Sequence, residues 1–143
     1  MFVVLELRQN NDALRLQSQD SIADGFMQLN LASINDSSVA RLWVIGLHEP
    51  ERLNDIEAIQ FSFYLRGVFN QLQRIHSLYK TGIISEQEWS PYAKEAAFMM
   101  TSNGGKLYFE DNWLHRGFEK DIMKYNTEKP NIDFRLGRDS LPN

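Results

Sequence analysis

The order of hydrophobic and polar residues along this chain of 143 residues follows a helical period almost throughout. No segment alternates apolar and polar residues with the period of two, bounded by hairpin turns, that is typical of β-strands. The sequence therefore predicts an all-α protein, a helical bundle of about five helices in which the first and the third helices are long.

The first helix is predicted over residues 3–33, a stretch without proline. Between positions 9 and 24 the residues are mostly Asn, Gln, Ser and Asp, so the apolar stripe of this helix is thin. The stripe consists of Leu7, Leu14, Ile22, Phe26 and Leu29. It is too narrow for the core of a monomer but adequate for pairing. We therefore expect residues 1–37 to form a long polar amphipathic helix, a stalk or dimer arm.

A short second helix is predicted over residues 39–45. The polar side chains at positions 35–38 can cap its first turn, because their oxygens accept hydrogen bonds from free N–H groups. Apolar residues surround nearly its whole circumference, so we expect it to be buried on several sides. Gly46 is expected to end it, since glycine adopts the left-handed conformation of a helix terminus without steric cost.

The third helix has the clearest signals in the sequence. Asn54 and Glu57 form a variant of the capping box at its start, and Gly82 marks its end. Its apolar seam recurs at steps of three and four residues, as in a heptad repeat: Phe61, Leu65, Val68, Leu72, Ile75 and Tyr79. Four more apolar residues are expected to widen this face: Ile56, Ile59, Phe63 and Phe69. A face this wide predicts a helix at the centre of a bundle.

A second capping box, Ser85 with Glu88, follows the third helix. Pro91 complicates the prediction, because proline lacks the N–H that would bond back to Gln87 and its ring clashes there. Either the helix kinks at Pro91, or a new helix starts there with Ser90 as its cap. We favour the second alternative, a turn at residues 85–89 and a helix over residues 90–101.

The triplet Asn103-Gly104-Gly105 is expected to break the chain again, and a last helix is predicted over residues 106–125. On this plan residues 38–125 form a compact helical body. Residues 126–143 contain Pro130, Gly137 and Pro142 without an apolar period, and we expect an irregular C-terminal tail.

Composition narrows the classes of function. The chain has no cysteine, which excludes disulfides, thiolate metal sites and cysteine catalysis. It carries 15 Lys+Arg against 19 Asp+Glu, a net charge of -4, without a concentrated basic patch, so we expect no nucleic-acid partner. Nine Phe, five Tyr and three Trp need an interior or a partner surface to cover them. Most of them lie between Phe61 and Tyr125, within the predicted body.

Residues Met1 to Leu5 form an apolar run that stops at Glu6. The run is far shorter than the roughly 20 residues of a membrane-spanning helix, and it lacks the pattern of a signal peptide. Two interpretations stay open. The run is either a helix start that packs on the body, or the last turn of a membrane helix upstream of Met1, with Arg8 at the cytoplasmic flank. The second interpretation predicts a membrane tether, and both predict a cytoplasmic location, on the inner face of a membrane where the tether is present.

The pattern Gly82-Ile83-Ile84-Ser85 with Trp89, then Gly104-Gly105 with Trp113 and Phe118, resembles a family of small uncharacterised bacterial proteins, a domain of unknown function. The resemblance covers roughly residues 5–118. Members of that family often carry an N-terminal membrane helix that runs into a segment like Glu6-Leu7-Arg8-Gln9-Asn10. The resemblance implies a membrane-tethered, mostly helical module, and it brings no catalytic residues.

A candidate metal site lies on the last predicted helix, where Asp111, His115 and Glu119 are spaced i, i+4, i+8 along one face. Such a row could supply oxygen and nitrogen ligands, or a carboxylate that orients an imidazole for proton transfer. The alternative is a solvated face stabilised by ion pairs with Arg116 and Lys120.

A candidate ligand site involves polar and aromatic residues near the third helix. Arginine suits a carboxylate or phosphate, and an aromatic-lined cavity could hold a small molecule. The polar candidates on the third helix are Tyr64, Arg66, Asn70, Arg74 and His76, and the cavity is expected near Tyr64, Arg66, Trp89 and Trp113. The alternative places the arginines on the outer side of the helix, with their stems covering apolar surface.

No Ser-His-acid constellation or other catalytic motif can be selected, so we expect no catalytic residues and no cofactor. The first functional hypothesis is a helical interaction or oligomerisation module, membrane-proximal in its native context, that binds a protein partner or a second copy through the first helix. The alternative is a small-molecule-binding helical bundle of the kind found in sensors. A metal-dependent enzyme built on Asp111, His115 and Glu119 is the third hypothesis.

Overall fold

The computed structural model describes residues 2–109, 114–115 and 117–126, the side chains of 32–34 excepted. Within these ranges the chain forms helices and no strand, which confirms the all-α prediction. The helices are α1 (Phe2–Asn35), α2 (Ser37–His48), the 3-10 turn η1 (Pro50–Arg52), α3 (Asp55–Lys80), α4 (Glu86–Thr101), α5 (Asn103–Tyr108) and α6 (Phe118–Met123). As predicted, the first and the third helices are long, with 34 and 26 residues.

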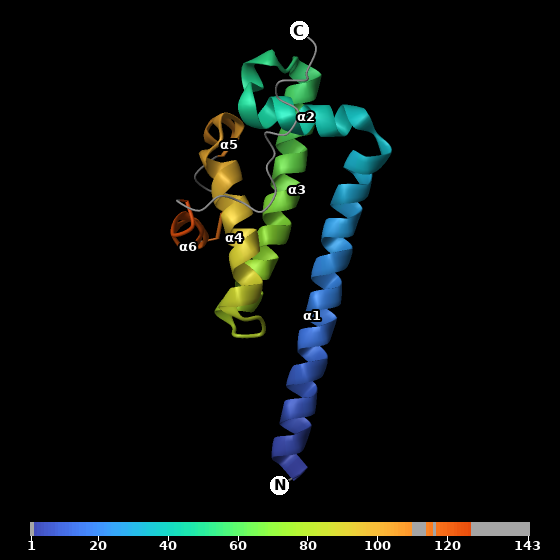
Figure 1. Ribbon diagram of the computed structural model, residues 1–143, viewed down its shortest axis with the longest axis vertical. Coiled ribbons are helices and arrows are strands. Elements are labelled where there is room, and N and C mark those ends of the chain that lie inside the picture. The colour runs from blue at the N-terminus through green and yellow to red at the C-terminus, as the bar shows by residue number, and fades with distance from the viewer. Residues whose placement is uncertain (1, 110–113, 116, 127–143) are drawn as a thin grey trace.

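The helices are arranged around α3 (Figure 1). The long helix α1 rises along one side, α2 crosses the top, and α3 returns downward between α1 and α4. The short helices α5 and α6 lie on the far side of α4 from α1. The N-terminal end of α1 projects beyond the turn that joins α3 and α4, so this end has no neighbour among the described elements.

The predicted capping box of α3 is present. The Asn54 side chain accepts from the backbone N–H of Glu57, and the Glu57 carboxylate accepts from the backbone N–H of Asn54, both at 3.0 Å. The predicted seam faces the core: Val68 and Tyr79 are partly buried, and four members are completely inaccessible to solvent, namely Phe61, Leu65, Leu72 and Ile75. The start of α3 and its inner face therefore follow the sequence prediction.

The expectation that a wider set of apolar residues covers the inner face of α3 is wrong for three residues. Phe69 is buried, but Ile56, Ile59 and Phe63 are 70%, 56% and 64% exposed. At 100° per residue these three lie on the side of the helix opposite the seam. The apolar character of these three residues therefore did not indicate whether their face of α3 is packed or exposed.

The prediction that Gly46 ends the second helix is also wrong, because α2 continues to His48. Gly46 lies where α2 crosses the ring of Phe61, and a Cβ at this position would be 2.2 Å from a ring carbon. On α5, a Cβ at Gly104 would be 1.8 Å from the carbonyl oxygen of Gly46. These two glycines thus allow α2, α3 and α5 to approach each other closely, and neither ends a helix.

The expected turn at residues 85–89 is wrong. The capping box of Ser85 and Glu88 is formed, but it opens a single helix, α4, that continues through Pro91. Trp89, in the first turns, is only 1% exposed. We attribute the continuity of α4 to this cap and this burial, which together offset the hydrogen bond that Pro91 cannot donate.

The predicted last helix over residues 106–125 is wrong as a single element. Helix α5 ends at Tyr108, and α6 covers only Phe118–Met123. The break expected at Asn103 is real, but it falls at Ser102, whose hydroxyl caps α5 by accepting from the N–H of Gly105. The predicted tail lies outside the described residues from position 127 onward.

The second half of α1 belongs to the packed body. Ile22 is 8% exposed and lies in the hydrophobic core, and the Phe26 ring stacks on Tyr92 of α4 with 5.4 Å between centroids. The compact body therefore begins within α1, ahead of residue 38.

The role of Gly46 predicts opposite effects for two glycine substitutions within helices. Gly46→Ala should lower the free energy of unfolding by about 1–3 kcal/mol, because its methyl group would overlap the Phe61 ring. Gly67→Ala on α3 should leave stability unchanged or raise it by up to about 1 kcal/mol, because its Cβ would be 3.8 Å from the nearest side-chain atom. Urea unfolding followed by circular dichroism measures both, and equal effects would contradict the packing argument.

Candidate functional site

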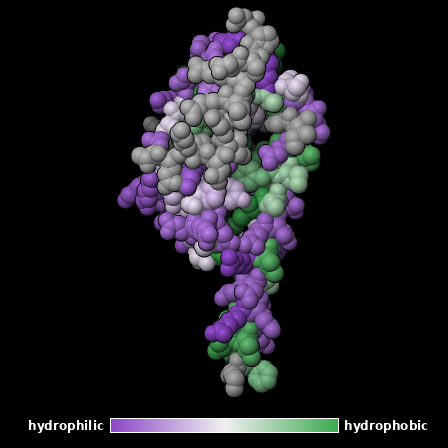
Figure 2. Space-filling view, viewed as in Figure 1, coloured by the Kyte–Doolittle hydropathy of each residue, from purple (hydrophilic) through white to green (hydrophobic). Residues whose placement is uncertain are grey.

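The projecting end of α1 carries exposed apolar side chains. We define the free half of α1 as residues 2–14. Its large apolar residues are 50–84% exposed: Phe2, Val3, Val4, Leu5, Leu7 and Leu14. Figure 2 shows hydrophobic residues among hydrophilic ones on this projecting end. The interpretation in which residues 1–5 pack on the body is therefore wrong for residues 2–5, the part that the structure describes.

Contact between α1 and the body begins at Arg15. The Arg15 guanidinium lies 3.0 Å from the Glu88 carboxylate at the start of α4, and the Gln19 amide donates to the same oxygen at 2.6 Å. Hydrogen bonds from the Ser85 backbone and from Arg15 lower the pKa of Glu88 to about 2. Glu88 thus caps α4 and holds α1 with one ionised carboxylate.

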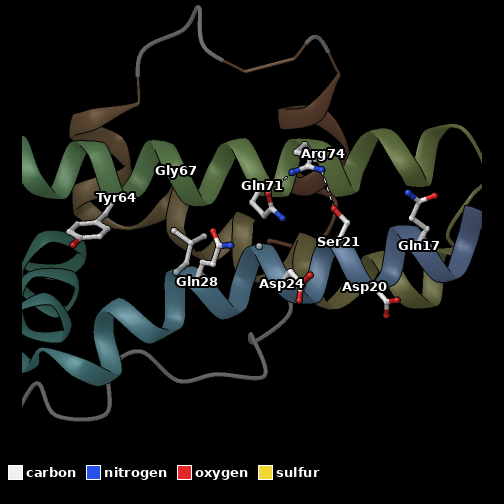
Figure 3. Close-up of a pocket in the computed structure, with 11 residues that line it drawn as sticks. Gln17, Asp20, Ser21, Asp24, Gln28, Tyr64, Gly67, Gln71 and Arg74 are labelled. Carbon is white, nitrogen blue, oxygen red and sulfur yellow. Dashed lines mark hydrogen bonds between the residues drawn. The ribbon is translucent and has the colours of Figure 1, made fainter.

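A groove of about 720 Å³ runs between α1 and α3 (Figure 3). At its floor the Gln71 side chain lies on the backbone of Gly25, where a Cβ would be 1.8 Å from the amide nitrogen. Arg74 of α3 donates to Ser21 of α1 at 3.2 Å, which joins the two helices, and to Gln71 of its own helix at 3.4 Å. Tyr64 lines the same groove further along α3.

The predicted ligand residues are divided among different places. Tyr64 and Arg74 line the groove, whereas Arg66 does not line it and is exposed. Trp89 lies in the filled core, stacked on Tyr79 at 5.8 Å between ring centroids. Trp113 lies outside the described residues.

The groove therefore differs from the aromatic-lined cavity expected from the sequence. Tyr64 is the one aromatic residue among its described lining residues, and its polar groups include Asp20 and Asp24 on α1 and Arg74 on α3. Such a lining suits a polar ligand better than an apolar one. Ligand binding in this groove stays a prediction.

The metal site was predicted on the premise that its residues share one face of a single helix, and this premise is wrong. His115 lies between α5 and α6, Glu119 lies on α6, and Asp111 is outside the described residues. In the part of the chain that the structure describes, no three His, Asp or Glu side chains are grouped so that they could hold a metal ion.

The structure reveals a charged cluster around Asp121, of which the sequence analysis had singled out only His76. Asp121 of α6 is 9% exposed and contacts three cationic or ionisable groups of α3 and α6. Its carboxylate lies 2.8 Å from His76 Nε2, 3.2 Å from Lys80 Nζ and 3.0 Å from Lys124 Nζ. The hydrogen bond with His76, followed by those from Lys124 and Lys80, holds the pKa of Asp121 well below its usual range, although burial raises it.

The His76 ring is enclosed by aromatic side chains. Its centroid lies 5.2 Å from Trp89 of α4 and 5.3 Å from Phe118 of α6. Because Asp121 is ionised, its oxygen accepts the hydrogen bond and His76 Nε2 donates it. The pair thus joins α6 to α3 inside an aromatic cluster.

Beside this pair, a second pocket of about 480 Å³ opens between α3 and α6. Its lining residues are His76, Ser77, Lys80, Thr81, His115, Gly117, Lys120 and Asp121. The backbone N–H of His115 donates to the side-chain oxygen of Gln73, which holds His115 at this pocket. His115 was predicted as a metal ligand, but the structure places it among lysines.

No protein-family model matches this chain, and comparisons with curated proteins and with solved structures gave no match. The resemblance to a family of small bacterial proteins therefore rests on the sequence pattern alone. Among the described helices, none is both long and apolar enough to cross a membrane.

The Asp121 cluster predicts a pH-dependent loss of stability. Asp121→Asn should lower the free energy of unfolding by about 3 kcal/mol at pH 7, because it removes a buried charge from its partners. A carboxyl with a depressed pKa stabilises the fold above its ordinary pKa, near 4, and loses that contribution as the pH falls through the folded value. The difference between wild type and variant should therefore shrink below about pH 4.

Urea unfolding at neutral and acidic pH measures this difference. Glu119→Gln is the matched control, because Glu119 lies on the same helix but is exposed, and it should change stability by less than about 0.5 kcal/mol. A destabilisation by Asp121→Asn that is equally large at acidic pH would contradict the ionised cluster.

Proposed function

We propose that this protein is a helical interaction module that self-associates through the free half of α1. The observation that carries the proposal is that Val4, Leu7 and Leu14, which share one side of α1 at 100° per residue, are all at least half exposed. An apolar stripe on a helix is stabilised when another surface covers it. No described element of the same chain lies beside this half, and we propose that a second copy of the chain covers it.

The spacing of residues in the free half suits a partner helix. Val4, Leu7, Asn11 and Leu14 recur at steps of three, four and three, the positions that face a partner in a coiled coil. Extending the repeat leads to Ser21 and Gly25, which face Arg74 and Gln71 of α3. The apolar seam therefore continues the side of α1 on which α3 lies, past the point where α3 ends.

This placement favours an antiparallel pair of α1 helices. A parallel copy on the seam would continue into the space that α3 already occupies beside Ser21 and Gly25. An antiparallel copy runs away from that space, so each body lies at an opposite end of the pair. The macrodipoles of two antiparallel helices also point in opposite directions, so they attract each other. In this arrangement Val4 of one copy lies opposite Leu14 of the other.

The overlap of two free halves is short. Thirteen residues of helix span about 20 Å, so the buried area is at the low end for specific complexes. We therefore propose a reversible dimer whose population depends on protein concentration.

Replacing the two seam leucines should abolish the dimer. In the double variant Leu7→Asp/Leu14→Asp, two charges enter the seam, and dimerisation should weaken by about 100-fold or more, at about 1.4 kcal/mol per tenfold change. Leu16→Asp is the matched control, because Leu16 is 62% exposed on the other side of α1 and should leave the dimer intact. Sedimentation equilibrium measures both constants.

Two other results would contradict the proposal. The first is a wild-type protein that stays monomeric at high concentration in sedimentation equilibrium. Binding of that monomer to lipid vesicles through Phe2 to Leu5 would instead favour the membrane contact expected from the sequence.

The direction of the pair can be tested by cross-linking, because the chain has no cysteine of its own. Val4→Cys protein mixed with Leu14→Cys protein should form a mixed disulfide on oxidation, faster than either protein alone. Faster linkage of Val4→Cys to itself would indicate a parallel pair and contradict the antiparallel arrangement.

A further inference from the structure

The pocket between α3 and α6 has a surplus of positive charge. Its lining includes the ammonium groups of Lys80 and Lys120 and a single carboxylate, that of Asp121. Lys80 contacts that carboxylate, whereas no ion pair between described residues involves Lys120. The chain as a whole has a net charge of -4, so this local surplus runs against the overall balance.

The other ionisable groups around the pocket do not remove the surplus. Lys124 also contacts Asp121, and Glu86 of α4 acts on Lys124 from the other side. Glu119 is exposed on α6 and does not line the pocket. His115 lines the pocket, is exposed to solvent and carries a ring N–H donor.

We infer that this pocket binds a small oxyanion, a phosphate group or a carboxylate, through Lys80, Lys120 and His115. All three side chains carry N–H donors, and oxyanions accept charge-assisted hydrogen bonds from such groups. Asp121 repels the anion and acts as a positioning residue, since it holds Lys80 and His76 at the pocket wall. Thr81 also lines the pocket, but its hydroxyl donates to the backbone carbonyls of Ser77 and Leu78, so the lysines and the histidine supply the donors.

The arrangement favours phosphate over carboxylate. A phosphate group presents three terminal oxygens against the two of a carboxylate, so it can accept from more of the N–H donors of Lys80, Lys120 and His115 at once. A volume of about 480 Å³ leaves room for the organic part of a small phosphomonoester. The self-association through α1 involves other residues, so the two proposals stand or fall separately.

Chemical shifts of backbone amides, recorded by nuclear magnetic resonance, test this site directly. Inorganic phosphate and acetate are titrated separately into the protein at constant ionic strength, with chloride as the balancing anion. We expect saturable shifts confined to residues 76–81 and 117–121, with tighter binding of phosphate. Tighter binding of acetate would assign the site to a carboxylate. No saturable shift with either anion up to about 10 mM would overturn the inference, since even a weak specific site has a Kd of about 1 mM.

Two lysine variants separate the site from general electrostatic attraction. Lys120→Ala should weaken phosphate binding by about tenfold, because it removes one charge-assisted hydrogen bond. Lys106→Ala removes an exposed lysine of α5 and should leave the affinity unchanged. Equal affinities of Lys120→Ala and wild type would also overturn the inference. Both lysines are exposed, so the amide spectrum of each variant verifies that its fold is retained.

Discussion

The structure depends on one geometric constraint: α1 is longer than the helices against which it packs. Its 34 residues span about 51 Å, whereas the 26 residues of α3 span about 39 Å. Contacts from Arg15 onward fix α1 to the body, through Glu88, the Gly25–Gln71 approach and the buried Ile22. Because α1 is a continuous helix fixed at one end, its first half must extend into solvent with its apolar residues uncovered.

The sequence predicted the elements whose signals are local. The capping boxes at Asn54 and Ser85 and the seam of α3 depend on residues a few positions apart, and all three are present. The errors arose where distant residues decide the local structure. Glycine at position 46 leaves the space that the Phe61 ring occupies, and it does not end α2. Trp89 is buried at the point where Pro91 would otherwise favour a break in α4. The apolar periodicity of residues 106–125 gives no sign that the last predicted helix is split into α5 and α6.

The candidate sites were predictable to different degrees for the same reason. Tyr64 and Arg74 were found because polar residues stand out on an otherwise apolar helix, and both line the groove beside α1. His76 was singled out for the same reason, but its pairing with Asp121 was missed, because 45 positions separate the two residues. Burial of this pair places lysines around a pocket, so a contact that stabilises the fold also creates a candidate binding site.

The central claim, an antiparallel pair joined through the free halves of α1, fixes the overall length of the assembly. Small-angle X-ray scattering across a concentration series measures that length most directly. Two α1 helices that overlap over residues 2–14 extend about 80 Å from end to end, against about 51 Å for one helix. The account predicts that the maximum dimension rises to at least about 80 Å as the concentration increases. A dimension that stays near the length of one α1 at every concentration would contradict it.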